Sequence, residues 1–147
     1  MMKTYLVSIC LLILGIVGCV GWTNAPRVAT SCSLENTWSV ALSSLQEFEL
    51  RRIDKAEGVI ETEWIAVHNP KTVGGGIFQR SMNQERARFI LNITPDQQGS
   101  MITVKQIREF WSPQGVQSRA WRQIPPHEEQ ERQLATRIEN QIKRQAC

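Results

Sequence analysis

The sequence is poor in the side chains from which catalytic and metal sites are usually built. It contains only two histidines, His68 and His127, and their spacing does not suit a metal site with the cysteines. It has no Gly-x-Ser-x-Gly motif, and its triple glycine at residues 74–76 lacks the Lys-Ser/Thr of a phosphate-binding loop. We therefore predict no catalytic residues, no metal ion and no cofactor.

Neither sign of charge dominates the chain. Its 17 Lys and Arg residues face 14 Asp and Glu residues, and the basic residues are scattered along the sequence. Nucleic-acid-binding proteins usually concentrate basic side chains on one face. We therefore expect no nucleic-acid partner.

The one long apolar run lies at the N-terminus. It follows Lys3, covers residues 5–17 and leads into Gly18 and Cys19. A positive start, a short apolar stretch and a small residue before the cut are typical of a secretory signal. The run is too short for a comfortable transmembrane helix, which needs about 20 apolar residues. We expect residues 1–18 to be a signal peptide.

The residues Ile16-Val17-Gly18-Cys19 resemble the bacterial lipobox, usually Leu-(Ala/Ser)-(Gly/Ala)-Cys. The resemblance implies that the Cys19 thiol is acylated and that the chain is cut just before it. Acyl chains, at about 0.8 kcal/mol per buried methylene, would hold the protein on a membrane. Val20 stands where an inner-membrane retention signal often has Asp, which favours the outer membrane, facing the periplasm. The alternative is an uncleaved apolar helix with a chance cysteine.

The remaining chain predicts a tether followed by one domain. Residues 19–32 begin with the lipidated cysteine and have no periodicity, and residues 33–147 are long enough for a single compact domain. Cys32 and Cys147 remain after processing. An oxidising envelope would allow them to form a disulfide between the start of the first helix and the C-terminus. Two free thiols are the alternative.

The apolar pattern of this domain predicts two helices and four strands. Helical spacing is found over residues 34–47, where Trp38 is expected in the core, and over residues 127–145. Apolar and polar residues alternate, as they do in strands, over residues 48–54, 59–68, 86–94 and 101–110. We predict an α+β fold of order α-β-β-β-β-α, with two layers: a four-stranded antiparallel sheet and both helices packed on one face.

Part of this domain resembles a known family. Trp38, Asp54, Gly58 and Trp64, within residues 34–67, resemble the pattern of the BamC (NlpB) type of outer-membrane assembly lipoprotein. There a helix leads into a strand, an Asp-x-x-x-Gly turn and a second strand. BamC itself has two such domains, and this chain has room for one. The resemblance implies a non-enzymatic envelope protein that contacts a protein partner during outer-membrane assembly or maintenance.

Two carboxylates of the second predicted strand could be read as an acid-base pair. Glu61 and Glu63 would share a face, about 7 Å apart. However, Arg51, Arg86 and Arg88 are expected on neighbouring strands. Cross-strand ion pairs on a solvated sheet face therefore explain these residues better.

Four apolar residues are candidates for contact with a partner. Ile77 and Phe78 lie in a long link between two strands, and Trp111 and Trp121 bracket a segment with Pro and Gly. Packing into the core is the alternative for each. A second hypothesis for the whole protein is a binding module for a lipid or a cell-wall ligand. A groove between sheet and helices would favour this module, and a flat exposed aromatic patch would favour the protein partner.

The lipid anchor is testable by substitution. Cys19→Ala removes the only thiol of the lipobox-like sequence, so this variant should no longer incorporate labelled palmitate and should be uncleaved or mislocalised. Equal palmitate incorporation in the variant and the unchanged protein would refute the assignment. Sucrose-gradient fractionation of the unchanged protein from a proteobacterial host should place it with the outer membrane.

Overall fold

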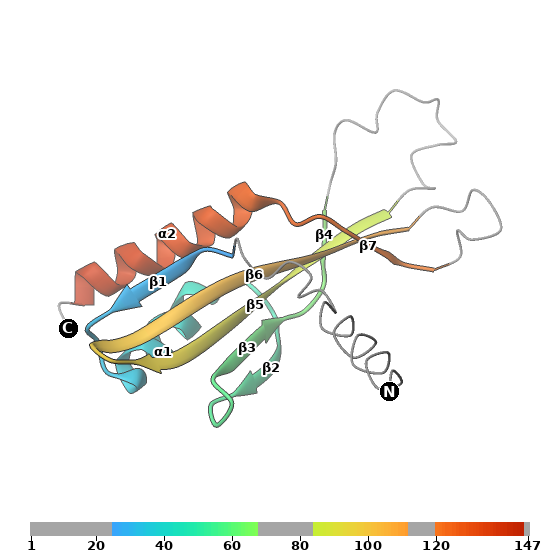
Figure 1. Ribbon diagram of the computed structural model, residues 1–147. Coiled ribbons are helices and arrows are strands. Elements are labelled where there is room, and N and C mark those ends of the chain that lie inside the picture. The colour runs from blue at the N-terminus through green and yellow to red at the C-terminus, as the bar shows by residue number, and fades with distance from the viewer. Residues whose placement is uncertain (1–24, 68–83, 112–119, 146–147) are drawn as a thin grey trace, which may run out of the picture.

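The fold is a twisted antiparallel sheet that carries two helices (Figure 1). The computed structural model describes residues 25–67, 84–111 and 120–145. The helices are α1 (Leu34–Ser44) and α2 (Glu128–Gln145). The strands are β1 (Arg27–Thr30), β2 (Leu50–Asp54), β3 (Val59–Thr62), β4 (Ile65–Ala66), β5 (Gln84–Asp96), β6 (Gly99–Trp111) and β7 (Arg122–Ile124).

The longest strands, β5 and β6, form a hairpin at the centre of the sheet. The strand order is β1-β6-β5-β3-β2, with β4 paired to β5 and β7 paired to β6. Each hairpin strand has 13 residues, and the register runs without a break from Gln84↔Trp111 to Asp96↔Gly99. Strands β1, β3, β4 and β7 each pair with only part of this hairpin, and β2 pairs with β3. The hairpin is therefore the frame on which the remaining elements are placed.

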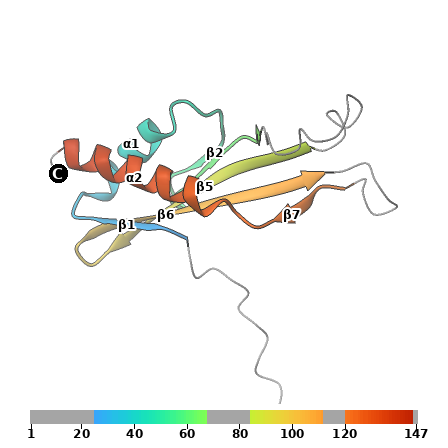
Figure 2. The same cartoon turned by 90° about the horizontal axis from the view of Figure 1, so that it is seen from above.

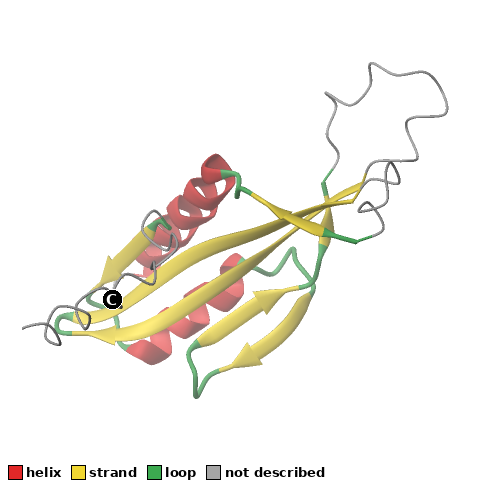
Figure 3. Ribbon diagram, turned by 45° about the vertical axis from the view of Figure 1, so that its right-hand side comes forward, coloured by secondary structure: helices red, strands yellow, loops and turns green. Residues whose placement is uncertain are grey.

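Both helices pack on the same face of this frame (Figure 2). That inner face is apolar because every second residue of β5 and β6 points to it, among them Leu91 and Val104, which are fully buried. Trp38 of α1 and Ile138 of α2 join the same cluster. Trp38 is 6% exposed, which confirms its prediction as a core residue. Figure 3 shows the strands in front of the helices, with the outer face of the sheet toward the viewer.

The predicted α+β class, antiparallel sheet and two helices are confirmed, but the prediction of four strands is wrong. Within the described residues, the sheet has seven strands. The additional ones are short: β1 has four residues, β4 has two and β7 has three. Such strands are too short to show a clear alternation of apolar and polar residues. The second predicted strand is divided, because the chain leaves the sheet between β3 and β4.

The predicted tether also ends earlier than expected. Arg27–Thr30 forms β1, whose Val28 pairs with Ile102 and is buried. The domain therefore begins with a strand, and the helix α1 comes second. Pro26, which suggested a linker, accepts a hydrogen bond from the backbone of Val104 at 3.0 Å. Proline is tolerated there because β1 is an edge strand.

Helix α1 is shorter than predicted. It begins after Ser33, whose hydroxyl accepts a hydrogen bond from the backbone of Asn36 at 3.3 Å, as an N-cap does. It ends at Ser44 instead of residue 47. Ser43 and Ser44 both donate to the carbonyl of Val40, at 3.0 and 2.8 Å. Serine hydroxyls that bond locally to the backbone compete with helix continuation.

Cys32 lies just before α1 and is 1% exposed. It is disulfide-bonded. Its predicted partner, Cys147, lies outside the described residues, so their pairing stays a prediction. Helix α2, which ends at Gln145, packs against β1, the strand that leads to Cys32.

A carboxylate fills a gap along the free edge of β6. The partner strand β1 reaches only to Thr103, and β7 pairs only from Arg108 onward. Between them, the backbone N–H of Gln106 donates to Glu131 of α2 at 2.7 Å. Glu131 is 4% exposed, and burial raises the pKa of its carboxyl group above its ordinary value. The strand edge therefore depends on a buried acid.

Two substitutions at Glu131 distinguish the contribution of its hydrogen bond to stability from the contribution of its charge. Glu131→Ala leaves the N–H of Gln106 buried without an acceptor, which should cost about 1–3 kcal/mol in urea unfolding. Glu131→Gln keeps an acceptor without a charge. Because folding raises the pKa of Glu131, its contribution to stability is greatest at acid pH and declines as the pH rises through the folded value.

The Gln variant should consequently gain stability relative to the unchanged protein as the pH rises from acid to neutral. Glu128→Gln, an exposed change in the same helical turn, is the matched control for the hydrogen bond and should cost little. An Ala variant as stable as the unchanged protein at both pH values would show that Glu131 does not hold the edge of β6.

Candidate functional site

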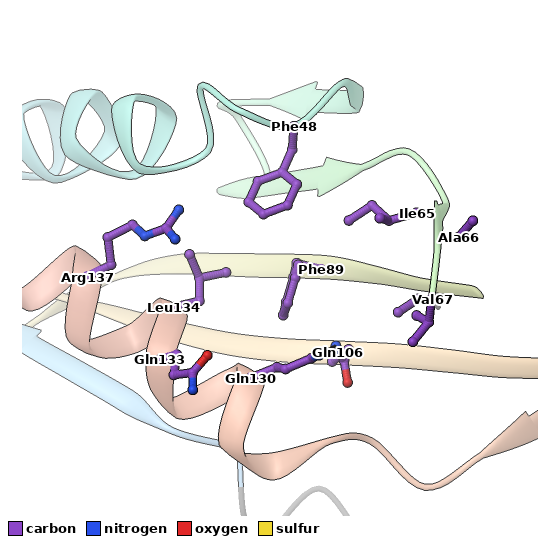
Figure 4. Close-up of a pocket in the computed structure, with 11 residues that line it drawn as sticks. Phe48, Ile65, Ala66, Val67, Phe89, Gln106, Gln130, Gln133, Leu134 and Arg137 are labelled. Atoms are coloured by element: carbon purple, nitrogen blue, oxygen red, sulfur yellow. Dashed lines mark hydrogen bonds between the residues drawn. The ribbon is translucent and has the colours of Figure 1, made fainter. Parts of the chain in front are cut away.

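A groove lies on the inner face of the sheet, between α2 and β4 (Figure 4). Its volume is about 380 Å³. Its floor and walls are mostly apolar and come from the loop after α1 and from β4, β5 and α2: Phe48, Ile65, Val67, Ala87, Phe89 and Leu134. Ligand pockets typically measure roughly 300–1,000 Å³ and are lined in this way.

The groove exists because the helical layer is shorter than the sheet beneath it. Helix α1 has 11 residues, or about 16 Å at 1.5 Å per residue, whereas β5 has 13 residues, or about 43 Å when extended. Beyond Ser44 no second helix lies beside α2. Phe48 covers this part instead, with its ring 5.8 Å from that of Phe89. The floor is thereby buried, while Phe48, Ile65 and Val67 at the walls stay partly exposed.

Polar side chains of α2 line one side of the groove. Gln130, Gln133 and Arg137 follow one another along the same side of the helix. Arg137 donates from Nη1 to Glu47, and Gln133 donates to Glu129 at 3.2 Å. Figure 4 shows Arg137 at one end, Ile65 and Val67 at the other, and the two phenylalanines between them. The groove thus has its one charged lining residue at one end and apolar residues at the other, with Gln106 and Gln130 between them on the α2 side.

The outer face of the sheet carries a second feature, a stack of one arginine between two tryptophans. The guanidinium carbon of Arg86 lies 4.2 Å from the ring centre of Trp64 and 3.9 Å from that of Trp121. Glu109 accepts from Nε and Nη2 of Arg86 at 2.9 and 2.6 Å. Cation–π contact and the ion pair together fix the position of both indoles. We call these residues the Trp–Arg cluster.

An ion pair with Arg88 confirms the prediction that Glu61 forms a cross-strand pair. Its carboxylate pairs with Arg88 at 2.5 Å, and both side chains are more than four-fifths buried. This is the cross-strand pairing that the sequence predicted. Arg86 does not pair with Glu61 or Glu63, as we expected. Its partner is Glu109, which lies directly opposite it on β6. Glu63 is exposed, and neither it nor Arg51 takes part in an ion pair within the described part of the chain.

The structure describes only some of the predicted contact residues. Trp121 belongs to the Trp–Arg cluster, while Trp111 ends β6 opposite Gln84 and is half-buried. Ile77, Phe78 and the predicted lipidation site Cys19 lie outside the described residues. Trp111 and Trp121 are thus both only partly exposed.

Sequence reasoning did not find the residues of the groove. Phe89 was covered only by the strand predicted over residues 86–94, and Arg137 only by the helix predicted over residues 127–145. The spacing of Gln130, Gln133 and Arg137 beside the apolar stripe of Leu134 and Ile138 was the available signal. It could not show that a groove lies next to them, because that depends on where α1 ends.

Within residues 25–67, 84–111 and 120–145, three or more His, Cys, Asp or Glu residues nowhere gather as metal ligands would. In the same ranges, the helices are too short or too polar to span a membrane. No protein-family model matches the chain, and no curated protein is significantly similar to it.

Proposed function

We propose that this chain is a lipid-anchored protein of the bacterial envelope, facing the periplasm, and that it binds an apolar ligand in the groove between α2 and β4. The function is binding without covalent chemistry. The lipobox-like sequence ending in Cys19 supports the anchor. The ligand would be a lipid or an apolar cell-wall fragment, since both occur where such an anchor would hold the protein.

The groove is the observation that carries this proposal. Its floor, with Ala87 and Phe89, is buried, but the apolar lining residues Phe48, Ile65 and Val67 stay partly exposed at its walls. A protein gains free energy by burying such surface, at roughly 25 cal/mol per Å². An apolar ligand would supply the missing cover.

The test uses a substitution that fills the groove with a larger side chain. Ala87 lies on its floor, so Ala87→Trp should place an indole in the existing space and exclude the ligand. Ala29→Trp on the exposed face of β1 is the matched control, since it adds the same ring away from the groove. Both variants are checked for native circular dichroism before use.

The measurement uses the full chain in isolated membranes and a photoreactive fatty alcohol with a clickable tag. After illumination, labelled peptides are identified by mass spectrometry. Peptides that contain Phe48, Val67 or Phe89 should be labelled, and Ala87→Trp should lower this labelling about tenfold, the equivalent of 1.4 kcal/mol, while Ala29→Trp leaves it unchanged. Absence of label in these peptides, both with this alcohol and with the matched fatty acid, would refute ligand binding in the groove.

A second candidate function is contact with an envelope protein through the Trp–Arg cluster, in outer-membrane assembly or maintenance as the BamC-like pattern implies. Trp and Arg are the residue types that most often dominate protein interfaces. The stack holds both indoles in place, so little side-chain entropy would be lost on binding.

This second candidate is tested with a photo-crosslinking amino acid at Gln123, an exposed residue opposite Glu109 and close to Trp121. One discrete adduct in cells should form and should disappear when Trp121→Ala is added. The same probe at Thr94, on the exposed far end of β5, should give no such adduct. An adduct that persists in the Trp121→Ala background would exclude the cluster as the contact.

A further inference from the structure

We propose that the groove selects a single-chain lipid with an anionic head group, with the head at Arg137 and the chain directed toward β4. This inference rests on the proposed binding function of the groove. It adds the chemical class of the ligand and its orientation.

The arrangement of side chains along the groove indicates an amphipathic ligand. Arg137 and Gln133 lie at one end, and Ile65 and Val67 at the other (Figure 4). Phe48 and Phe89 line the middle. A wholly apolar ligand would make no use of the remaining donors of Arg137, and a polar ligand would bury no surface at the apolar end.

The polar end favours a negative head group because its only charged lining residue is an arginine. A guanidinium has five N–H donors and binds carboxylates and phosphates through two parallel hydrogen bonds. Glu47 engages Nη1 of Arg137, and the Arg137 side chain is 48% exposed. Further donors thus remain for a head group at the mouth. Gln133 adds an amide beside it.

The size of the groove favours one chain over two. Its volume of about 380 Å³ lies near the lower end of the range for ligand pockets, roughly 300–1,000 Å³. The groove also has a single apolar end, formed by the two residues of β4 and by Val67. A lipid with two long chains would have to leave one of them in water.

Glu47 affects how strongly the groove binds an anionic head group. Its carboxylate competes with any anionic ligand for Arg137, because both are acceptors for the same guanidinium. Removing the charge of Glu47 should therefore strengthen binding of an anionic ligand. It should leave binding of a neutral ligand of the same chain length unchanged. A purely structural role of the Glu47–Arg137 pair would not produce this difference.

The experiment compares two probes that differ only in the head group. A photoreactive, tagged fatty acid and the matched fatty alcohol are added to isolated membranes that contain the full chain, without ATP or coenzyme A, so that neither probe is esterified. The pH is kept where the carboxylate is ionised. Labelling of the peptides with Phe48, Val67 and Phe89 is quantified by mass spectrometry.

Three substitutions complete the design. In the unchanged protein the acid should label these peptides about tenfold better than the alcohol, which corresponds to 1.4 kcal/mol. Arg137→Gln should abolish this preference, and Glu47→Gln should increase it. Arg132→Gln is the matched control, because Arg132 lies on the same helix, is 62% exposed and does not line the groove. It should keep the preference.

The possible failures are distinguishable. Equal labelling by acid and alcohol that Ala87→Trp removes would overturn the head-group inference and keep the binding function. An acid preference that survives Arg137→Gln would also overturn it. If neither probe labels the groove peptides in the unchanged protein, the proposed binding function itself is wrong.

Discussion

The whole structure depends on one long hairpin, in which 13 residues of β5 pair with 13 residues of β6 in a continuous register. Because side chains alternate between the two faces of a strand, this register determines which residues meet the helices and which meet solvent. Gly99 sits where the hairpin turns back, and a Cβ there would lie 2.2 Å from the carbonyl oxygen of Thr30. That close contact brings β1 against the end of β6, and so it connects the start of the domain to its centre.

The mismatch between this hairpin and the helices produces both candidate sites. On the inner face, α1 ends early, and the uncovered surface between α2 and β4 becomes the groove. Beyond the N-terminal end of α2, the inner face carries charged side chains. There Arg108 donates hydrogen bonds to Glu85 and to the carbonyl of Pro125 instead of packing under a helix. The same end of the hairpin carries Arg86 with its two tryptophans on the outer face of the sheet. Apolar and charged surfaces therefore meet at one end of the molecule, where the sheet is least covered.

The sequence predicted those parts that are determined by local periodicity. The stripe of Leu134 and Ile138, the alternation around Leu91 and the core position of Trp38 are visible in the order of residues alone. Strand β1 was missed because only Val28 among its four residues is buried, and β7 because three residues show no period. The groove and the stacking of Arg86 on Trp121 depend on tertiary placement of distant segments. The pairing of Glu61 with Arg88 was predictable, since both lie on adjacent strands with alternating side chains.

The central claim is that the uncovered inner face beside α2 is a binding surface. Methyl NMR of the intact protein during titration with a long-chain fatty acid tests it most directly. The account predicts saturable shifts for the methyl groups of Ile65, Val67 and Leu134, which line the groove. Those of Ile90 and Ile107, on the outer face of the same hairpin, should stay unchanged. Shifts of equal size on both faces, or none at Leu134 and Ile65, would contradict it.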